Sequence, residues 1–240
     1  MPKFETSTPV GQWVTECPRT ARVFENLQID YCCGGGKSLK EACALRHLDP
    51  SDVISLLHQT IADTASVDAN NSSQPDWAHA SLTELCDHIE QTHHAYLKAE
   101  LPRLTLLLQQ VAGAHGARHA ELYSLQDVFS RLRSELEPHL FKEEQILFPA
   151  IRQLEQSVGH SRFPFGSIAN PIRKMEHEHD QAGQALQEIR DLTGNFTVPE
   201  DACNTWRVMC DGLRNLEADL HQHIHKENNV LFPRARQRSR

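Results

Sequence analysis

Residues 138–149 read PHLFKEEQILFP and residues 222–233 read QHIHKENNVLFP, so one pattern returns 84 positions further along the chain. Each copy holds a histidine followed four residues later by a glutamate, namely His139 with Glu143 and His223 with Glu227. Residues i and i+4 share one face of a helix, so each pair aims an imidazole and a carboxylate at the same point. Two such helices facing each other would supply a two-metal site with two nitrogens and two bridging carboxylates.

Length, charge and cysteine content narrow the class of protein. A chain of 240 residues can bury a substantial core, and a net charge of -8 argues against a nucleic-acid partner. No apolar run approaches the roughly 20 residues that span a bilayer, and the opening residues lack the apolar stretch of a signal peptide. Seven cysteines, an odd number, are unlike a secreted disulfide scaffold. We therefore expect a cytoplasmic protein with reduced thiols, no membrane contact and no nucleic-acid partner.

A small, polar stretch that ends in proline and aspartate, residues 64–76 (TASVDANNSSQPD), has the composition of a linker. We expect an N-terminal helical domain over residues 1–63, a linker over 64–77 and a larger domain over 78–240. Short helical patterns occur in the N-terminal domain at residues 18–27, 38–45 and 49–62.

The larger domain contains four long helical patterns, separated by breaks that are rich in glycine or proline. They cover residues 81–111, 122–157, 171–192 and 200–236. In each pattern a candidate ligand occupies the apolar face, where a carboxylate is costly unless it is paired or bound to a metal. The expected fold is all-α, with a small helical N-terminal domain followed by an up-down-up-down four-helix bundle.

A histidine on the first and third helices, and a His-x-x-x-Glu pair on the second and fourth, give six candidate metal ligands. They are His88, His139, Glu143, His179, His223 and Glu227. A single isolated pair would more often be an exposed contact on a helix surface. Two copies on apolar faces, each followed by Leu-Phe-Pro, favour the metal site instead. Taken singly, His88 and His179 would more often be ordinary polar residues, and only the four-helix symmetry makes them candidates.

Neighbouring histidines are expected to face solvent, because helical geometry turns them away from the ligand face. They are His93, His94, His177, His221 and His225. A largely helical chain would also keep His115 and His119 well over about 20 Å from His139. Glu135 and Glu178 either orient a ligand imidazole or, as the simpler alternative, are solvated surface acids.

Nitrogen and oxygen ligation without thiolate suits iron or manganese better than structural zinc. If both glutamates bridge, each metal keeps room for a solvent-derived bridge and for an open position. Such a position is what redox or small-ligand chemistry needs.

The N-terminal domain carries a second candidate site, where Cys32 and Cys33 precede the glycine run 34–36. Adjacent cysteines beside flexible backbone can hold exposed thiolates of lowered pKa, for example at a helix N-terminus. The alternative is that one cysteine is buried packing and the other is incidental.

Together these residues resemble the repair-of-iron-centres family, the YtfE and ScdA type of bacterial di-iron protein. The resemblance covers nearly the whole chain and rests on DYCCGG at 30–35, DHI at 87–89, HLFKEEQILFP at 139–149, MEHEHDQAG at 175–183 and HIHKENNVLFP at 223–233. The C-terminal part is also similar to haemerythrin-like domains in general. The resemblance implies two iron ions on the six candidate ligands, bridged by carboxylates and an oxo group, and it places the family's cysteine pair at Cys32 and Cys33.

The function that the resemblance implies is repair of iron-sulfur clusters damaged by nitrosative or oxidative stress. Iron would be donated to client iron-sulfur proteins, with Cys32 and Cys33 as a thiol relay. Two alternatives use the same ligands: a nitric oxide reductase, and a sensor that binds nitric oxide or oxygen without turnover. The third helix aligns only His179 where oxygen-carrying haemerythrins have two histidines, which counts against oxygen carriage. Clients, electron donor and oligomeric state stay open, a homodimer included.

Overall fold

The computed structural model describes residues 4–67, 76–157 and 162–239. Every regular element within these ranges is helical, which confirms the predicted all-α class. The chain divides into two compact units, one made of residues 1–85 with 221–238 and 240, and one made of residues 86–220 with 239. Among the described helices, none is both long and apolar enough to cross a membrane.

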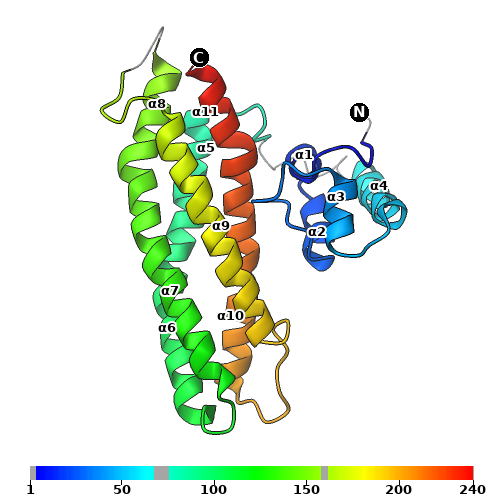
Figure 1. Cartoon of the computed structure of the whole chain (residues 1–240), viewed down its shortest axis with the longest axis vertical. Helices are drawn as coiled ribbons and strands as arrows, with labels where there is room; N and C mark the ends of the chain where they lie inside the picture. The colour runs from blue at the N-terminus through cyan, green and yellow to red at the C-terminus, as the bar shows by residue number, and fades with distance from the viewer. Residues whose placement is uncertain (1–3, 68–75, 158–161, 240) are drawn as a thin grey trace. The chain divides into compact units, whose positions relative to one another are not determined.

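Four long helical stretches form the bundle that the sequence predicts (Figure 1). The first comprises α5 (Leu82–His88), η1 (Ile89–His94) and α6 (Ala95–His115). The second comprises α7 (Glu121–Lys142), η2 (Glu143–Leu147) and α8 (Phe148–Gln156). The third is α9 (Ala169–Leu192), and the fourth comprises α10 (Asn204–His225), η3 (Lys226–Leu231) and α11 (Phe232–Arg238). Helix α7 packs against both α6 and α9.

The bundle is held by apolar side chains that recur every three or four residues on each helix. Leu101, Leu104 and Leu108 on α6 form one such stripe, and they share a buried cluster with residues of α7, α9 and α10. Burial of such stripes is the main favourable term in the folding of a helical bundle. The histidines and glutamates of interest interrupt these stripes and are therefore carried into the interior.

Three π-helical turns, η1, η2 and η3, interrupt the first, second and fourth stretches. A π-helix bonds residue i to residue i+5, so it accommodates an extra residue and changes the face on which the following side chains lie. The turn η2 also lets a new α-helix begin at Phe148, which puts Pro149 in the first turn, where its missing N–H is tolerated.

The N-terminal residues form four helices: α1 (Val10–Glu16), α2 (Thr20–Asn26), α3 (Leu39–Leu45) and α4 (Pro50–Val67). The last three confirm the predicted helical patterns, whereas α1 was not predicted. Helix α3 begins at a reciprocal capping box between Ser38 and Glu41. The predicted linker begins inside α4, and its residues 68–75 lie outside the described part of the chain.

Candidate metal centre

Two overlapping groups of buried side chains have the composition of a metal centre. One group is His139, Glu143, His179 and Glu227, and the other is His94, Glu143, His223 and Glu227. Within each group every residue offers a ligand atom, and these atoms all lie within 4.8 Å of one another. Both glutamates belong to both groups, as a pair of bridging carboxylates would.

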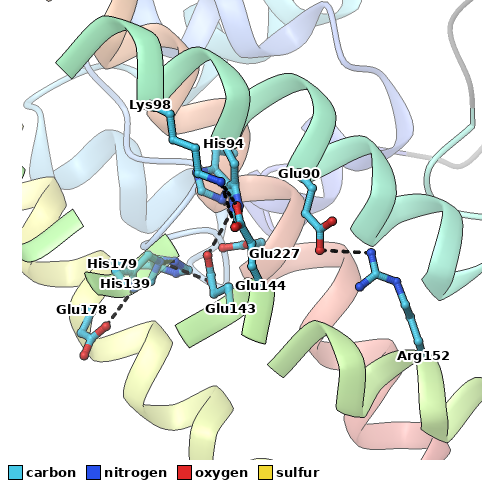
Figure 2. A network of polar contacts seen from close by, with 11 residues as sticks. Glu90, His94, Lys98, His139, Glu143, Glu144, Arg152, Glu178, His179 and Glu227 are labelled. Carbon is cyan, nitrogen blue, oxygen red and sulfur yellow. Dashed lines mark hydrogen bonds and ion pairs between the residues drawn. The ribbon is translucent and has the colours of Figure 1, made fainter. Parts of the chain in front are cut away.

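The carboxylate of Glu143 points its two oxygens at different histidines. Its Oε1 lies 3.3 Å from Nε2 of His139, and its Oε2 lies 3.4 Å from Nε2 of His94 (Figure 2). Nε2 of His179 lies 3.2 Å from Nε2 of His139. On the fourth stretch, Nε2 of His223 lies 3.2 Å from Oε1 of Glu227, the spacing that the repeated motif predicts.

Burial shows that this donor set fits a cation. The side chains of Glu143 and Glu227 are both 0% exposed, and ionised carboxylates in such a place need positive charge nearby to offset their lost hydration. Four imidazole nitrogens and two carboxylates, with no sulfur among them, make a donor set suited to iron or manganese.

Two of the histidines are oriented from behind by a carboxylate. Nδ1 of His139 lies 2.8 Å from Oε2 of Glu178, and Nδ1 of His94 lies 2.8 Å from Oε1 of Glu144. Each glutamate also accepts a hydrogen bond from a lysine: Glu178 from Lys142, and Glu144 from Lys98 (Figure 2). A carboxylate on Nδ1 fixes the tautomer that keeps the Nε2 lone pair free for a metal. Of the two interpretations of Glu178, the orienting one is therefore correct.

The charges of these outer carboxylates are stabilised by the same contacts. Burial raises the pKa of Glu178, but the hydrogen bonds from His139 and Lys142 outweigh burial and lower this pKa to about 2. Burial also raises the pKa of Glu144, but the contacts with Lys98 and His94 outweigh burial, and the net effect is a lowered pKa. Both side chains are therefore ionised at neutral pH and act as permanent hydrogen-bond acceptors.

The first helix departs from the sequence prediction. His88 belongs to neither group: it is half-buried, and its Nδ1 lies 3.2 Å from Oγ1 of Thr92. From the first helical stretch, the group of candidate ligands contains His94 instead. The expectation that His93, His94 and His225 face solvent is wrong, because all three are buried. The cause at His93 and His94 is the π-helical turn η1, which changes the face of the residues that end it.

Sequence reasoning also missed a polar contact beside the centre. Nδ1 of His93 lies 2.9 Å from Oδ1 of Asp219, which ties η1 to α10. Neither this pair nor His94 has a local signal in the sequence, since an i+5 turn has no composition of its own. An orienting role for Glu178 was one of two interpretations of the sequence, because Glu178 adjoins His179, but the sequence did not indicate that the imidazole in contact with Glu178 is that of His139.

The cysteine pair lies in a tight turn built on Asp30. The side chain of Asp30 accepts from the backbone amides of Cys32, Cys33 and Gly34 at 3.0, 2.9 and 2.8 Å. The two sulfurs are 3.9 Å apart, and Asp30, Cys32 and Cys33 form a third group of candidate ligands. Cys32 is buried, and the hydrogen bond with Cys33, followed by burial, raises its pKa well above the usual range. An exposed thiolate of lowered pKa is therefore wrong for Cys32.

Comparison with known proteins agrees with this geometry. Residues 86–235 match the family described as Hemerythrin HHE cation binding domain, and residues 6–61 match ScdA_N, described as a Domain of Unknown function (DUF542). The chain therefore belongs to the hemerythrin HHE family of cation-binding proteins.

Relatives with the name iron-sulfur cluster repair protein YtfE match almost the full length. The chain is 40% identical over 228 residues to the protein of Escherichia coli O1:K1 / APEC, and this alignment covers 95% of this chain and 96% of that protein. It is 38% identical to the protein of Edwardsiella ictaluri, over 95% of this chain and 96% of that one. For Musicola paradisiaca the identity is 37%, over 94% of this chain and 95% of its relative.

Proposed function

We propose that the chain holds two iron ions, with Glu143 and Glu227 bridging them. His139 and His179 would serve one ion, and His94 and His223 the other. The observation that carries this assignment is the divergence of the Glu143 oxygens, at 3.3 Å from His139 and 3.4 Å from His94. Membership of both glutamates in both groups supports it. When bound, such a pair supplies exchangeable iron and a one-electron redox couple.

The proposed role is repair of iron-sulfur clusters by donation of this iron to client proteins. The relatives carry that role in their names. Ligation by imidazole and carboxylate, without thiolate, is harder and more labile than the sulfur environment of a cluster protein. Iron would therefore move toward the sulfur-rich client.

The cysteine pair is proposed as an intermediate position for that iron. Two thiolates bound to one metal at roughly 2.3 Å in tetrahedral geometry are about 3.8 Å apart. The observed separation of 3.9 Å between the sulfurs of Cys32 and Cys33 is close to this value. Binding a divalent ion there would release the two thiol protons, and the bonds from the metal to both thiolates would have to outweigh the cost that the raised pKa of Cys32 adds to this deprotonation.

Metal analysis with Mössbauer spectroscopy on anaerobically loaded protein tests the assignment. We expect two coupled irons in the parent protein and loss of the coupled pair in Glu143→Leu and in Glu227→Leu. Glu188→Leu, on the outer side of α9, is the control, because Glu188 is exposed and pairs only with Arg131 among the described contacts. Two coupled irons in both bridging variants would contradict the bridge.

Transfer is measured separately, as regain of activity by a cluster enzyme inactivated with nitric oxide. The double variant Cys32→Ser/Cys33→Ser should keep its iron and restore the client more slowly. Turnover of nitric oxide over many cycles with the iron retained would contradict donation and favour a reductase.

A further inference from the structure

The turn that carries His223 and Glu227 is held on both flanks by one short segment, Tyr31–Cys32. On one flank, Nε2 of Gln222 donates to the hydroxyl of Tyr31 at 2.9 Å. On the other, Nδ2 of Asn229 donates to the main-chain carbonyl of Cys32 at 2.9 Å. Gln222 immediately precedes His223, and Asn229 follows Glu227 by two residues, so the two hydrogen bonds bracket the ligand pair.

The side chain of Asn229 sits in a slot that only glycine can line. A Cβ added to Gly11 would lie 2.4 Å from Oδ1 of Asn229, and one added to Gly35 would lie 2.2 Å from it. The same two glycines are joined by a hydrogen bond from the amide of Gly11 to the carbonyl of Gly35, at 2.9 Å. The space therefore exists because both residues lack a side chain.

The other half of the contact is equally constrained. Tyr31 is 1% exposed, and its hydroxyl donates to Glu25 at 2.8 Å while it accepts from Gln222. The backbone that follows it is fixed by the three amide contacts of Asp30. The carbonyl of Cys32 thus cannot move unless the cysteine turn moves as a whole.

The π-helical turn η3 needs contacts from outside the helix to hold its conformation. Glu227 lies within this π-helical turn, and i→i+5 hydrogen bonding is rare because it is less favourable than the α-helical pattern. The position of a carboxylate on such a turn therefore depends on the residues that contact the turn from outside. In metal sites generally, polar groups that contact a ligand orient it in the same way.

We propose that the Tyr31–Cys32 segment is a clamp on the His223–Glu227 turn, with Asn229 and Gln222 as positioning residues that set how fast this pair releases its metal. The inference rests on the proposed function for the presence of metal, and it extends that function by coupling the cysteine turn to the ligand pair. Any event at Cys32 and Cys33 that shifts their backbone, such as occupation by a metal, would loosen Glu227.

The test measures the rate at which ferrous ion passes from the loaded full-length protein to an excess of a coloured ferrous chelator. In Gly35→Ala the added Cβ would lie 2.2 Å from Oδ1 of Asn229 and 2.7 Å from the main-chain carbonyl of Tyr31. The variant therefore displaces both sides of this contact without altering the ligand-bearing helix, and we expect release to be about tenfold faster or more. Gly36→Ala is the matched control, because a Cβ at Gly36 meets nothing within 4 Å. Its release rate should equal that of the parent.

Asn229→Ala tests the same contact if Gly35→Ala does not fold. Its control is Asn215→Ala, at an exposed position on α10, the helix that precedes η3. If Gly35→Ala and Asn229→Ala release iron at the rate of the parent protein while Glu227→Gln releases it faster, the clamp is wrong and the metal assignment still holds. If the parent protein binds no iron, the proposed function fails instead, and the two failures are thus distinguishable.

Discussion

Nδ1 of His139 lies 2.8 Å from Oε2 of Glu178, a residue 39 positions away on α9. His94 has the same arrangement with Glu144, so two imidazoles from different helices are oriented by a carboxylate that a lysine holds in turn. This repeated arrangement makes the site rigid before metal arrives, because ring orientation and tautomer are set by the protein.

Glu178→Gln should weaken iron binding by roughly 10- to 100-fold, since an amide orients an imidazole less strongly than a carboxylate and lowers its basicity. Competition with a chelator of known affinity measures the change. Glu188→Gln is the control on the same helix, because Glu188 pairs with Arg131 on the outside of the bundle. Equal affinities for the two variants would refute the orienting role.

His94→Ala should lose half of the bound iron, whereas His88→Ala should retain the full amount. The reason is that His94 belongs to a ligand group and His88 does not. Metal content per chain, measured after gel filtration, separates the two variants. The opposite pattern would restore the assignment that helical spacing alone predicts.

Glu143→Leu should stabilise the metal-free protein while it disrupts metal binding. A buried carboxylate without its cation is costly, and an apolar side chain of similar size removes that cost, with a gain of about 1 kcal/mol or more in the free energy of unfolding. Urea unfolding of metal-free parent and variant measures it. A less stable metal-free variant would show that Glu143 is already well compensated by protein groups.

Acid should destabilise the metal-free protein partly through Glu178. Its pKa falls from the ordinary value of 4.5 to about 2 in the folded state. Between these pH values the folded protein therefore binds fewer protons at this group than the unfolded chain does. The stability from this group is present above about pH 5 and is lost as the pH falls toward 2. Unfolding curves of Glu178→Gln should therefore depend less on pH across this range than those of Glu188→Gln. Parallel curves would contradict the lowered pKa.

The helical bundle and five of the residues in the two groups could be predicted from the sequence. The repeated His-x-x-x-Glu lies on apolar faces, and both spacing and apolar periodicity are local properties of a helix. His179 followed from the same periodicity on α9. Helix α1 has the same length as α2 and α3 but was not predicted, because its sequence VGQWVTE contains a glycine, two valines and a threonine, which have low helix propensity.

The sequence by itself determined the class of fold and the chemistry of the donors, because helical periodicity and side-chain type are written residue by residue. Tertiary structure alone decided that His94 and not His88 belongs to a group of candidate ligands, that Glu178 and Glu144 contact Nδ1 of His139 and His94, and that Asn229 contacts the cysteine turn. The physical reason is that π-helical turns change the face of a helix according to what packs against it. Contacts between distant segments likewise depend on where whole helices are placed, which no local pattern specifies.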